Sequence, residues 1–217
     1  MINKEHPFWT IEEDQFISKW ARQTGRLDHD QWLLGQVDLR IPANRRDTFI
    51  DVGAYIGDHT VAYSRMFRIG YAIEPNPEAF SCLVHNTEPA EGKRRNVVCV
   101  NAAIGQGKYT MLTNAENPGA NKLVSDAAGD IPQLESYYLN GWVFGGIDYI
   151  KIDVEGMELQ VLNLLAAVID CCRPYMLIEQ RRCDGNEEAV GQWLTANGYT
   201  YEPIQGKRSE QYDLWCK

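Results

Sequence analysis

The sequence has no long apolar segment. No run approaches the ~18 to 20 apolar residues that a membrane-spanning helix requires, and the start of the chain, MINKEHPFWTIEEDQF, lacks the apolar core of a signal peptide. The six cysteines include no C-x-x-C pair and no spacing typical of a zinc finger. We therefore expect a cytoplasmic protein without a membrane partner, whose cysteines are mostly small core residues rather than a disulfide framework.

The chain also lacks an excess of positive charge. Its 217 residues carry a formal net charge of −9, and the basic clusters Arg45-Arg46 and Lys93-Arg94-Arg95 are short. Nucleic-acid binding depends on clustered Lys and Arg side chains, so no nucleic-acid partner is expected. There is no internal repeat or low-complexity tract. The length suits one domain with a small appendage, and the 44% of hydrophobic residues suffices for a substantial core.

The segment TFIDVGAYIGDHT, residues 48–60, predicts a buried strand that leads through a glycine turn into a helix. Gly53 and Gly57 are spaced G-x-x-x-G, which differs from the G-x-G-x-x-G of dinucleotide sites. The preceding Asp51 would repel a pyrophosphate but would suit the ammonium group of S-adenosylmethionine. A side chain at Gly53 would block the close approach of backbone and ligand. The turn therefore favours S-adenosylmethionine over a nicotinamide cofactor, although the glycines alone are also compatible with a plain strand-to-helix turn.

The segment YAIEPNP, residues 71–77, predicts a second short strand that ends in Glu74 and is followed by a proline-marked loop. In doubly wound sheets an acid at the end of the second strand is placed to accept hydrogen bonds from a ribose diol. Since the carboxyl ends of parallel strands meet at one edge, Glu74 and the glycine turn should form one adenosine-sized cleft.

From Thr48 onward strands and helices alternate, which predicts an α/β fold with a mostly parallel sheet and helices on both faces. Further strands are predicted at residues 96–104, 147–155, 175–179, 200–204 and 212–216, and helices at residues 59–67, 78–86, 157–168 and 187–197. No helix separates the last two strands, so this pair should be antiparallel. Residues 106–147 are rich in turn formers and predict an inserted hairpin and loop near the mouth of the site.

The N-terminal part precedes this alternation. We divide the chain into a helical extension, residues 1–44, and a main domain, residues 45–217. A helix is predicted at residues 7–24, a second helical piece after Asp30, and a short strand at residues 37–41. The extension is expected to cover part of the sheet or of the substrate opening, or to serve packing alone.

Acidic residues gather at the carboxyl end of the strand predicted at residues 147–155. Strand alternation places Lys151, Asp153 and Glu155 on one face, and Lys151 is expected to pair with an acid inside the sheet. Asp153, Glu155 and Glu179 of the next strand are candidate catalytic residues. They could accept the proton of an attacking hydroxyl, or they could bind magnesium or manganese through oxygen ligands. The sequence leaves these two roles open.

Taken together, these segments resemble the FkbM-type methyltransferases, which use S-adenosylmethionine. The resemblance spans about residues 48–200 and is carried by FIDVGAYIGDHT, AIEPNP, NAAIG, IKIDVEGMELQVL and LIE. It implies the seven-stranded, Rossmann-like class I methyltransferase fold, with O-methylation of a hydroxyl group on a sugar, polyketide or other small molecule. A nucleic-acid methyltransferase and a non-catalytic accessory protein that binds S-adenosylmethionine are the alternatives.

The resemblance also implies which residues hold the cofactor. The methionine part would lie at the glycine turn and the ribose at Glu74. The family often has Asn where this chain has Tyr55, and an aromatic residue is expected to alter how the loop closes on the cofactor. The candidate cofactor-binding residues are Asp51, Gly53, Tyr55, Gly57, Glu74, Asn76, Asn101 and Ala102.

Overall fold

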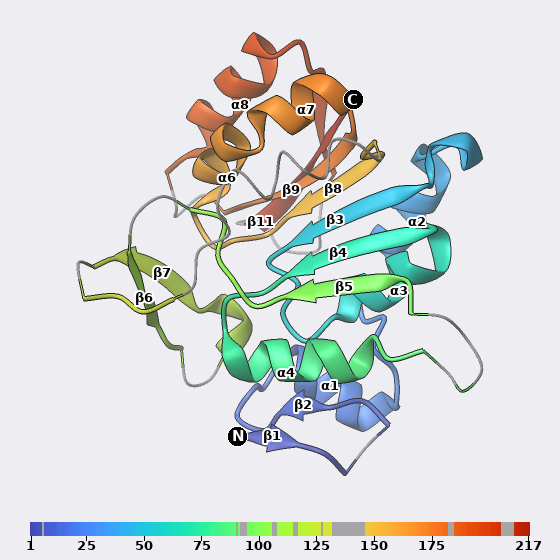
Figure 1. Cartoon of the computed structure of the whole chain (residues 1–217), viewed down its shortest axis with the longest axis vertical. Helices are drawn as coiled ribbons and strands as arrows, with labels where there is room; N and C mark the ends of the chain where they lie inside the picture. The colour runs from blue at the N-terminus through green and yellow to red at the C-terminus, as the bar shows by residue number, and fades with distance from the viewer. Residues whose placement is uncertain are drawn as a thin grey trace.

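A seven-stranded sheet forms the centre of the computed structural model, which describes residues 1–5, 7–89, 91, 95–105, 108–114, 117–126, 128–131, 146–181, 185–204 and 211–217. Its strands are β3 (Thr48–Val52), β4 (Ile69–Ile73), β5 (Val97–Val100), β8 (Tyr149–Ile152), β9 (Tyr175–Arg181), β10 (Tyr201–Ile204) and β11 (Gln211–Cys216). They lie in the order β10-β11-β9-β8-β3-β4-β5. Strand β11 is antiparallel to both of its neighbours, and the other pairs are parallel (Figure 1). The predicted mostly parallel sheet with an antiparallel last strand is confirmed.

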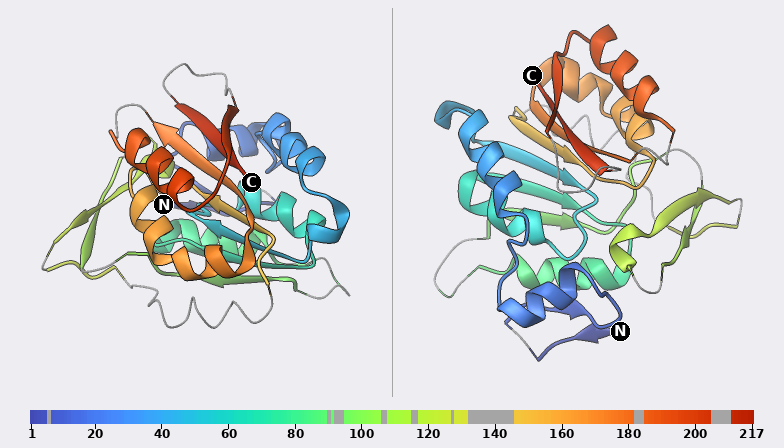
Figure 2. Two further views of the ribbon diagram at one scale, coloured as in Figure 1. Left: turned by 90° about the horizontal axis from the view of Figure 1, so that it is seen from above. Right: turned by 180° about the vertical axis from the view of Figure 1, so that it is seen from behind.

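Helices cover both faces of this sheet (Figure 2). They are α2 (Gln31–Arg40), α3 (Asp58–Met66), α4 (Pro77–Asn86), α6 (Glu158–Leu164), α7 (Ala166–Cys172) and α8 (Glu187–Ala196). Ile50 and Ile150 share one core with residues of α6, α7 and α8, whereas Phe49 and Tyr149 share another with residues of α2 and α3. Because neighbouring strand residues point to opposite faces, both faces need apolar side chains, which explains the continuous apolar runs in the sequence.

The first helix is shorter than predicted. Strands β1 (Ile2–Asn3) and β2 (Thr10–Ile11) form a small antiparallel pair, and α1 extends only over Ile17–Thr24. The prediction of a helix from residue 7 is therefore wrong for its first half. Asp14 Oδ2 accepts a hydrogen bond of 2.7 Å from the Ser18 amide in the first turn of α1, which favours a helix start after Asp14 rather than at residue 7.

The strand predicted at residues 37–41 is also wrong, because α2 continues to Arg40 and is followed by the short helix η1 (Ala43–Arg45). The Asp30 side chain caps α2 by accepting a hydrogen bond from the Leu33 amide. Residues 33, 37 and 41 are buried at a spacing of four, whereas Leu39 is 81% exposed. The apparent alternation at residues 37–41 is thus part of a helical stripe.

The predicted hairpin insertion is confirmed. Strands β6 (Tyr109–Leu112) and β7 (Lys122–Ser125) pair antiparallel, with the short helix η2 (Pro118–Ala120) between them. The hairpin lies on the side toward which β3, β4 and β5 point (Figure 1). The rest of the predicted loop, residues 132–145, and the turn at residues 205–210 lie outside the described residues. Among the described helices, none combines the length and the apolar character needed to cross a membrane.

Candidate functional site

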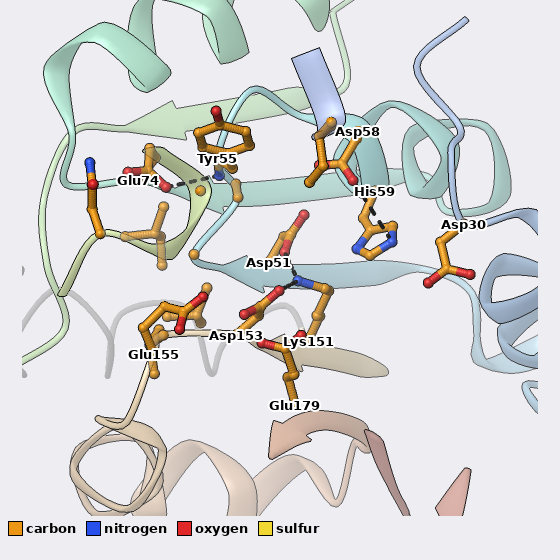
Figure 3. Close-up of a pocket in the computed structure, with 18 of the residues that line it drawn as sticks. Asp30, Asp51, Tyr55, Asp58, His59, Glu74, Lys151, Asp153, Glu155 and Glu179 are labelled. Atoms are coloured by element: carbon orange, nitrogen blue, oxygen red, sulfur yellow. Dashed lines mark hydrogen bonds and ion pairs between the residues drawn. The ribbon is translucent and has the colours of Figure 1, made fainter. Parts of the chain in front are cut away.

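A cleft of about 1060 Å³ opens at the carboxyl ends of β3, β4, β8 and β9. The turn after β3, Glu74 after β4 and the acidic residues after β8 line its floor (Figure 3). Side chains of the N-terminal segment and of the loop between β6 and β7 line the other sides. The volume is at the upper end of the range for small-molecule sites, so the cleft has room for a cofactor and a second molecule.

The glycine turn connects β3 to α3 through backbone of positive φ. Gly53, Tyr55 and Gly57 have φ angles of 81°, 48° and 91°. The Gly53 amide donates a hydrogen bond of 3.0 Å to the Ile73 carbonyl. A Cβ atom on Gly53 would lie 1.8 Å from the carbonyl oxygen of Asp153. The turn is therefore pressed against the ends of both neighbouring strands, and Gly53 is required by the protein itself as well as by the conformation.

Glu74 lies beside this turn with its carboxylate held by backbone amides. Its Oε2 accepts a hydrogen bond from the Tyr55 amide and its Oε1 accepts one from the Asn76 amide, each at 2.8 Å (Figure 3). Burial raises the pKa of Glu74 to about 7, although the two amide bonds oppose this rise. A carboxylate has about four acceptor positions, so Glu74 retains the capacity to accept two hydroxyl groups.

The two asparagines among the candidates bond to the protein backbone. Asn76 Oδ1 accepts hydrogen bonds from the Glu78 and Ala79 amides and so caps α4. Asn101 Nδ2 donates to the Glu74 carbonyl at 2.8 Å and fixes the loop after β4. Ala102, which is 5% exposed, lines the cleft. For both asparagines a direct contact with the cofactor stays a prediction.

Asp51, Lys151 and Asp153 form a charged row at the centre of the cleft floor. Asp51 on β3 and Lys151 on β8 are register partners. Lys151 Nζ lies 2.9 Å from Asp153 Oδ2 and 3.9 Å from Asp51 Oδ1, which confirms the predicted pairing of Lys151 with acids (Figure 3). Asp51 is fully buried, and its Oδ2 accepts a hydrogen bond of 2.6 Å from Thr60. Burial raises the pKa of Asp51, although the Lys151 ammonium opposes this.

The three candidate catalytic acids do come together. Carboxylate oxygens of Asp153, Glu155 and Glu179 all lie within 4.8 Å of one another. The alternation argument for Glu155 is nevertheless wrong, since β8 ends at Ile152 and Glu155 lies in a turn with a φ of 55°. That turn, rather than the strand, directs Glu155 into the group, where Arg181 Nη1 lies 2.5 Å from its Oε2.

Asp153 and Glu179 have opposite protonation tendencies. Burial alone would raise the pKa of Asp153, but the Lys151 ammonium holds it well below its usual range. Burial and the adjacent Asp153 carboxylate raise the pKa of Glu179 well above its usual range. Neighbouring carboxyl groups that interact this strongly titrate as a pair. Within this pair the proton is favoured on Glu179, and Asp153 favours the ionised form.

Sequence reasoning missed Asp213 on β11. This residue lines the cleft and lies directly opposite Glu179 in the antiparallel register. Burial, and secondly the Asp153 charge, raise the pKa of Asp213 to about 7. The sequence did contain a signal for this residue, namely an acid inside the strand predicted at residues 212–216, because a charge in such a position needs a partner or a function.

The contribution of the N-terminal segment to the cleft was predicted only in general terms. Trp20, His29, Asp30 and Trp32 all line the cleft. The His29 Nδ1 atom lies 3.6 Å from the buried Asp58 carboxylate at the start of α3. No local motif indicates these residues, because their place in the site depends on how the segment packs against α3.

We expect an Asp213→Asn variant to lose less stability than the wild-type protein as pH rises from about 4 to about 7. Over this window the folded protein holds a proton on Asp213 that the unfolded chain releases, so the wild-type protein becomes less stable with rising pH. Asparagine removes this loss, and the variant should melt at a higher temperature than wild type near pH 8. Thermal denaturation against pH measures the effect. Asp170→Asn, an exposed acid on α7, is the control, and an identical profile for the Asp213→Asn and wild-type proteins would contradict the assignment.

The sequence and the fold are similar to those of known proteins. The family model described as the methyltransferase FkbM domain matches residues 51–201, and no protein with a curated description matches the sequence. An FkbM methyltransferase from Methylobacillus flagellatus KT is similar in structure, with a TM-score of 0.54 and 17% identity over 80% of this chain. The alignment covers 44% of that protein, so the present chain spans less than half of its length.

Two further solved structures share the architecture. A Streptococcus mutans protein in complex with SAH has a TM-score of 0.55 and 12% identity over 86% of this chain and 95% of its own. An rRNA methylase from Streptococcus thermophilus has a TM-score of 0.53 and 9% identity over 86% and 93%. These likenesses show the class I methyltransferase fold. Since the family model covers more than half of the sequence, the chain belongs to the FkbM methyltransferase family.

Proposed function

We propose that this protein transfers a methyl group from S-adenosylmethionine to a hydroxyl group of a small molecule such as a sugar or a polyketide. The observation that carries the proposal is that one cleft contains both kinds of group that the reaction needs. Glu74 and the glycine turn lie at one end, and Glu179 lies beside Asp153 of the central charged row (Figure 3). Cofactor binding and acceptor chemistry therefore have distinct residues in one space.

The residues at the cofactor end fit S-adenosylmethionine. Glu74 would accept hydrogen bonds from the ribose hydroxyls, and Asp51 would face the ammonium group. The Oδ1 atom of Asp51 is buried without a hydrogen-bond donor among the described residues, since Lys151 at 3.9 Å is beyond hydrogen-bond reach. An orphaned buried oxygen of this kind favours a ligand that supplies a donor. When bound, S-adenosylmethionine supplies a methyl group on a positively charged sulfur.

The acids at the other end would take the proton of the acceptor. A neutral hydroxyl is a weak nucleophile, and a positioned carboxylate accelerates its attack by accepting its proton. Lys151 keeps Asp153 ionised, and Glu179 shares its proton with Asp153. In this proposal Asp153 and Glu179 accept the proton as one unit, while Arg181 holds Glu155 beside them.

The charge of the cleft supports a small molecule over a nucleic acid as the acceptor. Asp30 and Asp58 line the cleft together with Asp153 and Glu155. These carboxylates would repel a phosphate backbone, which nucleic-acid enzymes neutralise with Lys and Arg. Ionised carboxylates accept hydrogen bonds from hydroxyl groups, and the aromatic Trp20 and Trp32 offer apolar surface beside them.

A metal-assisted reaction is the second candidate, favoured by the 4.8 Å grouping of Asp153, Glu155 and Glu179. Three carboxylates would suit magnesium or manganese, and such an ion would lower the pKa of an acceptor hydroxyl. Lys151 and Arg181 already form ion pairs with members of this group. These pairs favour the metal-free version of the proposal.

We expect the wild-type protein to bind S-adenosylmethionine and S-adenosylhomocysteine but not NAD, and Glu74→Ala to weaken both interactions. Loss of charge-assisted hydrogen bonds to the ribose should cost about 1.5 to 3 kcal/mol, or roughly 10- to 150-fold in affinity. Isothermal titration calorimetry measures this loss. Glu158→Ala is the matched control, because Glu158 is also a buried carboxylate that accepts a backbone amide hydrogen bond, at 2.9 Å from Gly156. Equal affinities in the Glu74→Ala and Glu158→Ala variants would contradict the ribose role.

A further inference from the structure

Tyr55 is the residue of the glycine turn that reaches farthest from it. Its amide holds the Glu74 carboxylate, and its hydroxyl donates a buried hydrogen bond of 2.9 Å to Asp14 Oδ2. Its ring also lies against the loop between β6 and β7, since a Cβ atom on Gly119 would be 3.5 Å from the ring. A single side chain in a left-handed conformation thus joins Glu74 to two walls of the cleft.

Asp14 is the corresponding anchor in the N-terminal segment. It is fully buried, and its two oxygens accept hydrogen bonds from the Phe16 amide at 2.8 Å and the Ser18 amide at 2.7 Å. These bonds define the start of α1. The carboxylate therefore fixes both the first turn of α1 and the Tyr55 hydroxyl, so displacement of one should disturb the other.

Asn86 provides a second connection between the N-terminal segment and the glycine turn, in addition to the Asp14–Tyr55 hydrogen bond. Asn86 on α4 exchanges hydrogen bonds with the Trp9 backbone, at 2.8 Å and 2.9 Å, and also donates one of 2.8 Å to the Ile56 carbonyl in the glycine turn. The Tyr55 ring shares a core with residues of β2 and α1, among them Ile11 and Ala21. The segment is consequently packed onto the turn by apolar contacts and positioned by polar ones.

The same segment contributes the cleft wall that faces the charged row. Trp20 on α1 and His29 and Asp30 just before α2 line the cleft, and Asp30 appears at the edge of the close-up, across from Glu74 (Figure 3). The wall and the cofactor turn are thus connected through Asp14 and Tyr55.

We infer that Tyr55 is a positioning residue that couples residues 7–30 to the cofactor site. This segment then forms a wall of the cleft that contributes to cofactor affinity, rather than an appendage. The inference rests on the proposed function, because it takes S-adenosylmethionine as the ligand of the turn. Coupling between two sites is reciprocal. Cofactor binding must therefore slow hydrogen exchange in residues 7–30, and a substitution that breaks the contact between this segment and Tyr55 must weaken cofactor binding.

The test uses the full chain and S-adenosylhomocysteine as the probe. Tyr55→Phe keeps the ring and removes the hydroxyl, and it should weaken binding about 5- to 20-fold, within the usual range of coupling between sites. Hydrogen exchange of peptides from residues 7–30 should slow on binding in the wild-type protein and much less in Tyr55→Phe. A purely structural role for the hydroxyl would lower the melting temperature without removing this ligand-dependent protection.

Tyr63→Phe is the matched control. Its hydroxyl is also buried, but it accepts a hydrogen bond of 3.0 Å from the Tyr149 hydroxyl on β8 rather than bonding to residues 7–30. This variant should lose stability but keep the affinity for S-adenosylhomocysteine and the protection of residues 7–30. Asp14→Asn changes the other partner of the bond and should weaken binding as Tyr55→Phe does. The double variant should bind S-adenosylhomocysteine as tightly as the single variant with the lower affinity, because both substitutions act through one hydrogen bond.

Tyr55→Asn separates the coupling from backbone conformation, because Asn adopts positive φ more readily than Tyr but cannot reach Asp14. Wild-type affinity in Tyr55→Asn or Tyr55→Phe, or equal losses in Tyr55→Phe and Tyr63→Phe, would overturn the coupling while the proposed function stands. Absence of S-adenosylhomocysteine binding to the wild-type protein would overturn the proposed function and the coupling together. If Tyr55→Phe does not fold, Asp14→Asn decides the same question.

Discussion

An Asp153→Asn variant is expected to bind S-adenosylmethionine with nearly wild-type affinity and to turn over roughly 10² to 10⁴ times more slowly, the usual effect of losing a general base. The asparagine side chain cannot take the proton from the hydroxyl group of the methyl acceptor. It also lacks the carboxylate charge that raises the pKa of Glu179. Turnover is measured as formation of S-adenosylhomocysteine, after a screen of sugar and polyketide hydroxyls has identified an acceptor. Cofactor affinity is measured separately by calorimetry, so binding and chemistry are distinguished.

The substitution also removes the nearest partner of a buried lysine, so a loss of stability is expected and must be separated from the loss of turnover. Removing one member of a buried ion pair typically costs about 3 to 5 kcal/mol. Asp148→Asn is the matched control, because Asp148 comes just before β8 and pairs with Arg45 at 2.7 Å. It should lower the melting temperature without changing turnover per folded molecule. Full turnover in Asp153→Asn would exclude the base role, and activity lost to a chelator and restored by magnesium would favour the metal-assisted reaction.

The central sheet could be predicted because its signals are local. The parallel strands, such as β3 and β8, are short and mostly apolar runs that alternate with helices. Gly198, which follows α8 with a φ of 73°, likewise has the positive φ typical of a residue after a helix end.

Errors arose where two local patterns overlapped. Thr10 with Glu13 has the spacing of a capping box, yet Thr10 pairs with Asn3 in a strand, and it is Asp14 that accepts a hydrogen bond from the first turn of α1. Val37, Leu39 and Ile41 alternate like a strand, but the helical contacts made by Val37 and Ile41 in the core determine the structure. Packing partners decided both cases, and no short window of sequence contains them.

The grouping of Glu74 and Asp153 at one edge of the sheet could be predicted from the sequence, whereas Asp213 and the walls of the cleft could not. Glu74 and Asp153 were predicted near the carboxyl ends of parallel strands, and the sheet alone brings such positions to one edge. Asp213 enters through the pairing of β11 with β9, and His29 enters through the packing of the N-terminal segment. Both depend on contacts between residues far apart in the chain. Gly53 was predicted to be required, but the structure gives a different reason for it.

Replacement of Gly53 by Ala is expected to destabilise the protein by several kcal/mol and to abolish binding of S-adenosylmethionine. The new Cβ atom would lie 1.8 Å from the Asp153 carbonyl oxygen and 2.9 Å from its carbon, and backbone cannot move away as a flexible side chain can. The Gly53 amide is meanwhile held by Ile73 at 3.0 Å. The turn must therefore separate from the end of β8, which displaces Asp153 and the Glu74-bound Tyr55 amide together.

Gly198→Ala separates this collision from the cost of backbone conformation. Gly198 follows α8 with a φ of 73°, and a Cβ atom there would lie 3.6 Å from Arg173 Nη2, an ordinary van der Waals distance. This control should cost only the ~1 to 2 kcal/mol of a left-handed non-glycine residue. Thermal denaturation and calorimetry with S-adenosylhomocysteine compare the two variants. Equal losses of stability in the two variants would contradict the collision, as would wild-type cofactor affinity in Gly53→Ala. Gly53 would then be needed only for its positive φ angle.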